Sequence, residues 1–200
     1  MANLIILEGL SRTGKSSITK KLSEKYEFNN ISLKEKMPQC VESLPDFYHG
    51  IHVISNEFFK SFKDSTFILD RSFISELVYS RFFDRKTHVK DDTVVGDLLL
   101  DNNFVIFNLQ TIHKNYMDRT PKDRRIYSFD EFNKQKDSFY WYFEHYKNIN
   151  DQDSWKHRFV EIDTNVNSID QTIEIIEHHL RNLKIIKTEI YEKESSDSNR

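Results

Sequence analysis

The chain contains a single cysteine, Cys40, and no apolar run that approaches the roughly 20 residues of a membrane-spanning helix. One cysteine excludes an intrachain disulfide and is typical of a reducing compartment. No early segment joins a basic start to a long apolar stretch, so we expect neither a signal peptide nor a membrane anchor. We therefore expect a cytoplasmic protein with no membrane partner.

Charge of one sign is also lacking, because the formal net charge is only −3. The whole protein therefore offers no strong field that would attract nucleic acid or a membrane surface. The 200 residues, of which 38% are hydrophobic, are enough for one well-buried domain. We expect this domain to span residues 1–184. Residues 185–200 form a C-terminal extension, and its polar end from 192 to 200 is typical of a disordered tail.

Glycine is scarce, and two of the four glycines lie in one short segment. The segment Glu8-Gly9-Leu10-Ser11-Arg12-Thr13-Gly14-Lys15-Ser16 directly follows the apolar run Leu4–Leu7. It matches the pattern G-x-x-x-x-G-K-[ST], in which a strand, a glycine loop and a helix start follow one another. Gly9 and Gly14 stand where this loop needs a bend or a close backbone approach. The segment predicts a phosphate-binding loop.

Each residue type in this loop has a physical task. Successive backbone N–H groups and the positive end of the following helix attract phosphate oxygens. Lys15 supplies a point charge to the outer phosphates, and the Ser16 hydroxyl is a hard oxygen ligand for Mg²⁺. The residues predicted to bind the nucleotide are Gly9, Leu10, Ser11, Arg12, Thr13, Gly14, Lys15, Ser16 and Ser17.

Further apolar runs alternate with helical patterns along the chain. Strands are expected at Leu4–Leu7, Thr66–Leu69, Phe104–Leu109 and Phe159–Ile162, with a weaker one near Ile31–Leu33. Helices are expected after the loop, at Phe47–Phe62, at Phe73–Phe83, around Phe132–Tyr146 and at Ile169–Leu183. This alternation predicts an α/β fold with a parallel sheet covered by helices on both faces.

A second candidate site follows the strand Thr66–Leu69. Asp70 and Arg71 come directly after it, and ligands of parallel sheets gather beyond the carboxyl ends of the strands. Asp70 is suited to orient an acceptor hydroxyl or a water on Mg²⁺, and Arg71 to bind phosphate oxygens. A structural ion pair or a helix cap is the alternative interpretation.

Residues 117–128 interrupt the regular pattern with a charged, proline-containing segment. It carries Arg119, Arg124 and Arg125 and precedes an aromatic helix. Guanidinium groups can neutralise a phosphoryl group during its transfer, so we interpret this segment as a closing lid. A solvated basic loop is the alternative.

These blocks, taken in order from residue 3 to about 183, resemble the thymidylate kinase family of P-loop kinases. The resemblance implies a P-loop kinase fold with a five-stranded parallel sheet, helices on both faces and a lid. It also implies transfer of a phosphoryl group from ATP in the presence of Mg²⁺. Arg12 matches an extra loop arginine of some members, and Thr164 lies in the segment that resembles the turn passing the adenine. Members are commonly dimers, so a homodimer that pairs through the aromatic stripe of Phe47–Phe62 is one expectation; burial of the same stripe within one chain is the alternative.

The resemblance and the loop chemistry together assign the site residues. The expected catalytic residues are Lys15, Arg12, Asp70, Arg71, Arg119, Arg124 and Arg125. Mg²⁺ would be held by Ser16 and Asp70. The acceptor, a deoxynucleoside monophosphate such as dTMP or a related pyrimidine nucleotide, would contact Asp70, Arg71, Phe58, Tyr79 and Glu35.

Two departures from the family pattern keep other functions open. Ser11 stands where related loops carry an acid for the sugar, and Glu57 lies near the place of an arginine that grips the acceptor phosphate, although Lys60 or Lys63 could serve instead. A deoxynucleoside kinase with Glu35 as its base is one alternative. A kinase acting on a hydroxymethylated base in DNA is a second, and the only one with a nucleic-acid partner. A catalytically silent nucleotide-binding protein is a third.

A GTPase switch is disfavoured, because the chain has neither a D-x-x-G segment after an apolar strand nor an N-K-x-D segment. The eight histidines are scattered, and the neighbours His178 and His179 point about 100° apart on a helix, which does not build a shared metal site.

Overall fold

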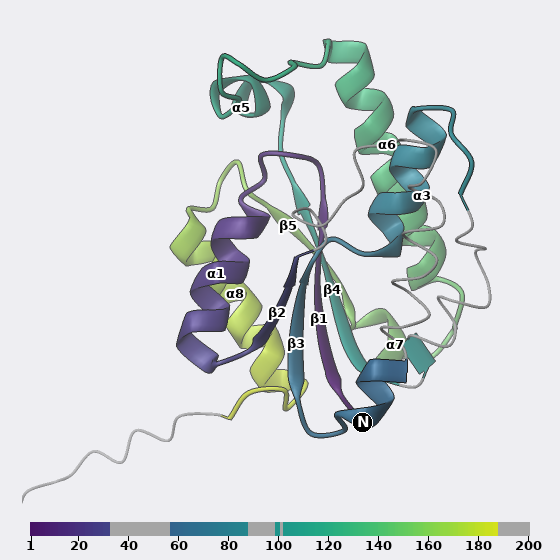
Figure 1. Ribbon diagram of the computed structural model, residues 1–200, viewed down its shortest axis with the longest axis vertical. Coiled ribbons are helices and arrows are strands. Elements are labelled where there is room, and N and C mark those ends of the chain that lie inside the picture. Colours follow the sequence, from purple (N-terminus) through teal and green to yellow (C-terminus); the bar gives the residue numbers. More distant parts are fainter. Residues whose placement is uncertain (33–56, 88–98, 101, 188–200) are drawn as a thin grey trace, which may run out of the picture.

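The computed structural model describes residues 1–32, 57–87, 99–100 and 102–187, which form three layers with a sheet in the middle (Figure 1). The strands are β1 (Asn3–Gly9), β2 (Asn29–Ser32), β3 (Thr66–Asp70), β4 (Asn103–Gln110) and β5 (Phe159–Asp163). They form a five-stranded sheet in the order β2-β3-β1-β4-β5, and every pairing is parallel. The predicted fold class is confirmed.

The helices divide between the two faces of the sheet. One face is covered by α1 (Lys15–Tyr26) and α8 (Ile169–Asn182), and the other by α3 (Phe73–Phe82) and α6 (Phe129–Lys147) (Figure 1). Two short helices, α5 (His113–Asp118) and α7 (Asp153–Lys156), flank α6 in the sequence. The carboxyl ends of the strands therefore face α5, the first turns of α6 and the loop before α1.

Alternation along the central strand feeds two separate cores. Leu4 and Ile6 of β1 belong to the cluster under α3 and α6, while Ile5 and Leu7 belong to the cluster under α1 and α8. All four side chains are fully buried, and such burial stabilises by about 1.5–3 kcal/mol for each side chain. Continuous apolar sequence is thus explained by a strand that is covered on both faces.

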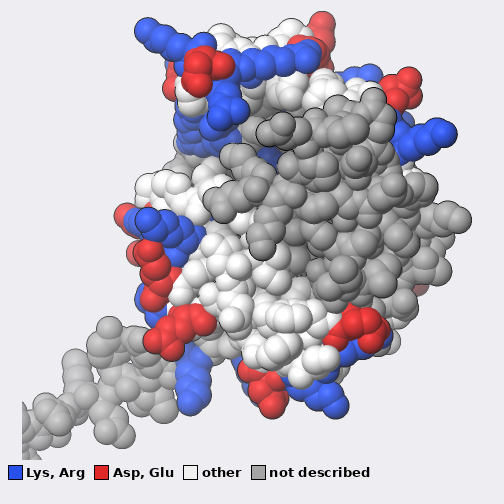
Figure 2. Space-filling view, viewed as in Figure 1, with Lys and Arg blue, Asp and Glu red and all other residues white. Residues whose placement is uncertain are grey.

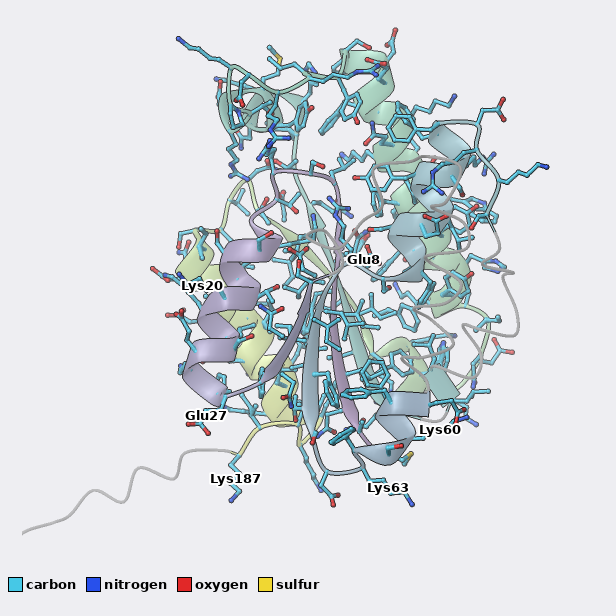
Figure 3. All side chains as sticks on the ribbon, viewed as in Figure 1. Glu8, Lys20, Glu27, Lys60, Lys63 and Lys187 are labelled. Atoms are coloured by element: carbon cyan, nitrogen blue, oxygen red, sulfur yellow. The ribbon has the colours of Figure 1, made fainter. Side chains whose placement is uncertain are left out.

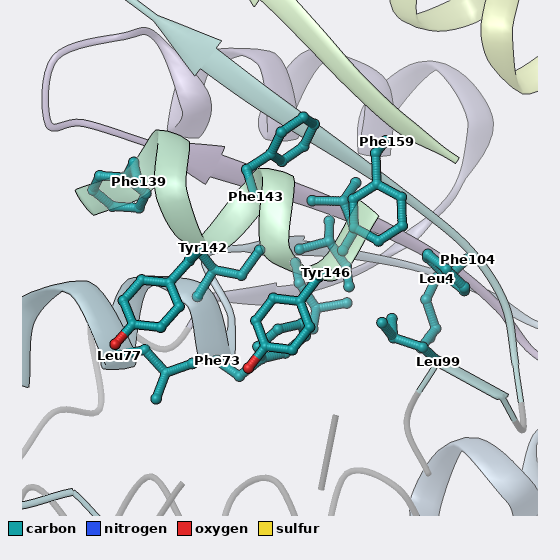
Figure 4. Packing of buried hydrophobic residues seen from close by; sticks show 14 of the residues in the cluster. Leu4, Phe73, Leu77, Leu99, Phe104, Phe139, Tyr142, Phe143, Tyr146 and Phe159 are labelled. Carbon is teal, nitrogen blue, oxygen red and sulfur yellow. The ribbon is translucent and has the colours of Figure 1, made fainter. Parts of the chain in front are cut away.

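The core beneath α3 and α6 is rich in aromatic rings. Figure 4 shows α6 placing Phe139, Tyr142, Phe143 and Tyr146 against α3 and the sheet. The Tyr146 ring meets Phe73 of α3 edge-on at 5.1 Å between centroids. These rings fix the position of α6, and hence of the segment that precedes it, relative to the strand ends.

The helix starts differ in a way that matters for the site. Two long helices begin with capping boxes, Ser128 with Glu131 for α6 and Ser168 with Gln171 for α8. In contrast, α1 follows Gly14 in the left-handed conformation, and no side chain caps it. The first turn of α1 therefore directs backbone donors and the positive end of the helix dipole at the loop.

Several predicted segments are shifted or extended in the structure. The weak strand predicted near Ile31–Leu33 begins earlier, at Asn29, because its backbone pairs with β3 at the sheet edge; Ile31 and Ser32 belong to it, and Leu33 lies outside the described residues. Ile185 and Ile186, beyond the predicted domain limit, are buried in the core under α1 and α8.

Other predictions fall partly or wholly outside the described residues. Of the predicted helix Phe47–Phe62, residues 57–61 are helical and residues 47–56 are outside. Cys40, Glu35 and the tail from 188 onward also lie outside the described residues. In the part of the chain that the structure describes, every helix is too short or too polar to span a bilayer.

Candidate active site

The loop between β1 and α1 lies at the carboxyl edge of the sheet, and its two glycines have different reasons to be there. Gly9 has a φ of 117°, and a Cβ added to it would lie 2.2 Å from the carbonyl oxygen of Leu109 in β4. Gly14 has a φ of 90° but ordinary space around it. Gly9 is therefore required by close backbone approach, and Gly14 by its left-handed backbone.

Lys15 lies inside the loop with only 5% of its surface exposed. Its Nζ donates to the carbonyl oxygens of Gly9 at 2.9 Å and Leu10 at 2.5 Å, and to Thr13 Oγ1 at 2.9 Å. The ammonium group is thus held inside the loop by three oxygen atoms, where it could reach a phosphate bound by the loop. A compact cation in this position suits polyphosphate oxygens.

Ser16 and Asp70 meet although 54 residues separate them. The Ser16 hydroxyl donates to Asp70 Oδ2 at 2.5 Å, and Asp70 is 5% exposed. A hydroxyl and a carboxylate oxygen are the hard ligands that Mg²⁺ prefers, together with water and nucleotide phosphates. The pair therefore fits the metal assigned from sequence. Among the described residues, no group of three or more His, Cys, Asp or Glu side chains forms a metal site of protein ligands alone.

Glu8, near the carboxyl end of β1, is the centre of a buried hydrogen-bond network that the sequence analysis did not predict. Its Oε1 accepts from the backbone N–H and the hydroxyl of Ser72, both at 2.7 Å, and its Oε2 accepts from the Ser75 hydroxyl at 2.5 Å. Only 1% of Glu8 is exposed. Figure 3 shows it at the carboxyl end of the strands. The carboxylate ties β1 to the first turn of α3.

Arg71, the residue directly after β3, completes this network. Its Nη1 donates to the Gly9 carbonyl at 3.2 Å and to Ser75 Oγ at 3.1 Å, and its Nη2 donates to Ser11 Oγ at 3.3 Å. Its backbone is left-handed with a φ of 81°. Burial lowers the pKa of Arg71, but the nearby Tyr79, Glu8 and Asp70 raise it to a net value above the ordinary one.

The predicted residues of the acceptor side are thus partly brought together. Asp70, Arg71 and Tyr79 lie at one place, since the Arg71 guanidinium lies 5.2 Å from the centre of the Tyr79 ring. Phe58 does not join them, because its ring packs on Phe67, near the amino end of β3.

The lysines named as substitutes for an acceptor arginine are also remote from the loop. Figure 3 shows Lys60 and Lys63 at the lower end of the molecule, whereas Glu8 lies near its middle, where the strands end. Glu57 forms an ion pair with Lys60 at 3.2 Å. The stabilisation expected of such an exposed pair is only about 0–1 kcal/mol.

On the other side of the loop, Arg119 joins three segments. Its Nη2 donates to the Thr164 carbonyl at 2.9 Å, and its Nη1 donates to Thr164 Oγ1 and to the Arg12 carbonyl, both at 3.3 Å. Thr164 in turn donates through Oγ1 to the carbonyl of Gln110 at 2.7 Å. The turn predicted to pass the adenine is therefore attached to the loop through an arginine of the predicted lid.

The remaining lid arginines pair with acids outside the loop. Arg125 pairs with Glu131 at 2.5 Å, and Arg124 approaches Asp123 only at 4.0 Å; both arginine side chains are at least 65% exposed. Figure 2 shows basic and acidic side chains gathered over this end of the molecule. The segment predicted to be a lid begins within α5, whose last residues are Met117 and Asp118, and continues without regular structure to Ser128.

Asn165 is a second residue whose role was missed. Its Oδ1 accepts from Thr111 Oγ1 at 3.0 Å, from the Ile112 backbone N–H at 2.9 Å and from Asn115 Nδ2 at 3.0 Å. One side chain beyond β5 thus caps α5 from across the sheet edge. It fixes the helix from which Arg119 extends.

A cavity of about 230 Å³ lies beside the loop on the α6 side. Leu10 lines it from the loop, Asn108 and Gln110 from the end of β4, and Phe139 and Tyr140 from α6. The loop therefore has open space on the side that α6 covers.

No family model matches the sequence, and no curated protein matches it either. Solved structures do match the fold. The YorR protein of Bacillus subtilis, solved in complex with phosphorylated GDP, aligns with a TM-score of 0.64 and 18% identity over 92% of this chain and 99% of its own.

Two kinases align over similar lengths. Thymidylate kinase from Candida albicans has a TM-score of 0.57 and 17% identity over 90% of this chain and 92% of its own. Deoxyadenosine kinase from M. mycoides with bound dATP has a TM-score of 0.56 and 16% identity over 89% and 99%. The fold is that of P-loop nucleotide and nucleoside kinases.

Proposed function

We propose that this protein is a kinase that transfers the terminal phosphoryl group of ATP to a deoxynucleoside monophosphate, with dTMP or a related pyrimidine nucleotide as the first candidate. The observation that carries the proposal is the convergence of two sequence motifs on one place. Ser16 of the loop bonds to Asp70, and Arg71 bonds to Gly9 and Ser11 of the same loop. An acid and an arginine that touch a phosphate-binding loop are positioned for an acceptor that must reach the phosphate.

In this mechanism the protein positions groups and neutralises charge, because phosphoryl transfer demands little covalent work from it. Lys15 turns from the loop carbonyls to the outer phosphates when the nucleotide binds. Mg²⁺, held by Ser16 and by Asp70 directly or through water, would neutralise charge on the phosphates. Asp70 orients the acceptor oxygen, and Arg71 binds the acceptor phosphate. Arg12 and the lid arginines stabilise the charge that develops during transfer.

The deoxynucleoside kinase alternative is favoured by one contact at the loop. Ser11, a neutral residue where an acid would engage the sugar, accepts a hydrogen bond from Arg71. An arginine that is already bonded to the loop and to Ser75 has fewer donors left for an acceptor phosphate. A neutral nucleoside has no phosphate and would therefore need no free Arg71 donors. Among the described residues, no contact specifically favours the modified-base or the silent-protein alternative.

The experiment is an ATP-consumption screen with Mg²⁺, in which Lys15→Ala serves as the blank. The acceptors are thymidine, deoxyuridine, the other deoxynucleosides, all their monophosphates, and duplex DNA with hydroxymethylated pyrimidines. Turnover on a monophosphate is expected and would support the proposal. Turnover on nucleosides or DNA alone would replace it with the corresponding alternative, and ATP binding without turnover would indicate a silent protein.

A further inference from the structure

The predicted lid is attached to α5 at both of its ends. Arg119 follows the last residue of α5 directly, and Tyr127, near the far end of the lid, contacts the same helix. The Tyr127 N–H donates to the Tyr116 hydroxyl at 3.2 Å, and the Tyr127 carbonyl oxygen lies 3.0 Å from His113 Nε2. The rings of Tyr116 and Tyr127 also stack, at 6.1 Å between centroids. Residues 113–128, the α5–lid segment, are therefore held together.

Hydrogen bonds attach both ends of α5 to one turn, the turn after β5. At the amino end, Asn165 Oδ1 accepts from the Ile112 N–H at 2.9 Å and from Asn115 Nδ2 at 3.0 Å. Just past the carboxyl end, Arg119 Nη2 donates to the Thr164 carbonyl at 2.9 Å. The helix has six residues and is about 9 Å long. Two attachments at its opposite ends fix both its position and its direction relative to the turn.

Asn165 is itself held in place by the strand that precedes it. Its backbone N–H donates to Asp163 Oδ1 at 2.8 Å, and its Nδ2 donates to the same oxygen. Thr111, which also donates to Asn165 Oδ1, is fully buried. Rings of α5 pack on Phe132 of α6 as well, but apolar packing is not directional, whereas hydrogen bonds fix both distance and angle. Asn165 and Arg119 therefore supply a directional link between the α5–lid segment and the turn.

We propose that Asn165 is a positioning residue that couples the binding of ATP at the turn to the position of the α5–lid segment, and so places Arg119 beside the phosphates. This inference deepens the proposed function and rests on it, because it takes ATP as the nucleotide that contacts the turn. A nucleotide with its base on the turn and its phosphates in the loop lies next to both partners of Arg119, namely Thr164 and Arg12. The amide of Asn165 is engaged by α5 and Asp163, so its effect on ATP affinity is transmitted through Arg119.

The test is a double-mutant cycle on the dissociation constant of Mg·ATP, measured by isothermal titration calorimetry. Asn165→Ala removes the acceptor of the α5 donors, and Arg119→Ala removes the group that Asn165 positions. We expect Kd to rise about 5-fold in Asn165→Ala and about 10-fold in Arg119→Ala. In the double variant the rise should stay near about 10-fold and not reach about 50-fold, because Asn165 has no further effect once Arg119 is absent. Factors that multiply would overturn the inference.

Asn167→Ala is the matched control, because Asn167 belongs to the same turn. Its Nδ2 donates to the Asp163 carbonyl at 2.8 Å, and among the described residues it makes no hydrogen bond to α5. It should change the Kd for Mg·ATP by less than about 2-fold. A rise as large as that of Asn165→Ala would overturn the inference, since any disturbance of the turn would then have the same effect.

If Asn165→Ala does not fold, Asn115→Ala takes its place in the cycle, because it removes one donor of α5 and leaves the turn intact. It should raise Kd about 2- to 3-fold alone and leave it unchanged when Arg119 is already alanine; factors that multiply would again overturn the inference. A wild-type protein that binds Mg·ATP but transfers nothing above the Lys15→Ala blank would refute the proposed function, while the cycle would still decide this inference. A wild-type protein without affinity for ATP would overturn both.

Discussion

The two sides of the phosphate-binding loop are built in opposite ways. On the side of β3 and α3, Glu8, Asp70 and Ser75 are each at most 5% exposed. The Glu8 carboxylate accepts short hydrogen bonds from Ser72 and Ser75, and the Asp70 carboxylate accepts one from Ser16. On the side of the predicted lid, Arg124 and Arg125 are at least 65% exposed, and their acidic partners are Asp123 of the same segment and Glu131 in the first turn of α6. Only Arg119, among the three lid arginines of the proposed site, contacts the loop.

This difference separates groups that must be in place before the substrates bind from groups that must move when they bind. Groups locked by packing and by a second layer of hydrogen bonds hold a reacting geometry to within a fraction of an ångström. Exposed arginines can exchange one anionic partner for another at little cost, because exposed ion pairs contribute about 0–1 kcal/mol. The buried side is therefore suited to align the acceptor, and the exposed side to close over a charged donor.

The largest effect is expected from Gly9→Ala. Its new Cβ would meet the Leu109 carbonyl, so β1 and β4 would have to separate, and we expect the free energy of unfolding to fall by more than about 3 kcal/mol. Gly14→Ala is the control, because only its left-handed backbone opposes a side chain; it should lose about 1–2 kcal/mol. Chemical denaturation measures both. Equal losses would show that close approach at Gly9 is not the limiting contact.

Glu8→Gln should sharpen the comparison on the buried side. The amide cannot accept from both Ser72 and Ser75 as the carboxylate does, so the melting temperature should fall by about 5–10 °C, equivalent to about 2–3 kcal/mol. Since Ser75 also bonds Arg71, kcat/KM for the acceptor should fall at least about 10-fold at temperatures where the variant is folded. Glu161→Gln, at an exposed site on β5, should leave both quantities nearly unchanged. An unaltered kcat/KM in Glu8→Gln would contradict the positioning role.

Lid substitutions should separate Arg119 from its neighbours. Arg119→Ala loses the contacts to Thr164 and Arg12, so we expect the KM for ATP to rise about 10-fold. Arg124→Ala and Arg125→Ala should lower kcat at nearly constant KM for ATP, with melting temperatures within about 1 °C of wild type. Steady-state kinetics at varied ATP distinguishes the two patterns. The same pattern in all three would mean that the lid acts as one unit.

The smallest effect concerns pH and lies away from the loop. Burial and the neighbouring His178 and His157 lower the pKa of His179, whose ring meets Phe107 edge-on. The unfolded chain then binds the proton more readily, so this contribution to stability is complete above about pH 6.5 and is lost as the pH falls through the folded-state pKa. Wild type should lose about 1–2 °C more than His179→Leu between pH 7.5 and 5.5. Parallel melting curves for the two proteins would contradict this.

The strands and the loop could be predicted from local pattern alone. Leu4–Leu7 is a short apolar run bounded by a glycine loop, and its residues are buried on both faces as such a run requires. The meeting of Ser16 and Asp70 also follows from sequence once the sheet is parallel, because Asp70 ends β3 and the loop that leads to Ser16 follows the carboxyl end of the neighbouring β1. The start of the edge strand β2 was predicted two residues late, because Asn29 and Asn30 give no signal of pairing.

The roles of Glu8, Asn165 and Phe58 could not be read in the same way. The partners of Glu8 and Asn165 lie about 50 or more residues away, and neither residue has a spacing that marks its task. Phe58 was assigned to the acceptor although its ring packs near the amino end of β3, since an aromatic residue looks the same in a site and in a core.

The central position of β1 also has a consequence during synthesis. Both of its partners, β3 and β4, lie more than 50 residues further along the chain. At about 5–20 residues per second, the ribosome leaves this apolar strand unpaired for several seconds. Nascent chains stalled before residue 66 should therefore be cleaved within β1 by an added protease, and chains long enough for β4 to leave the ribosome should be protected. The strand that carries the nucleotide loop is thus made first, but its permanent neighbours come much later.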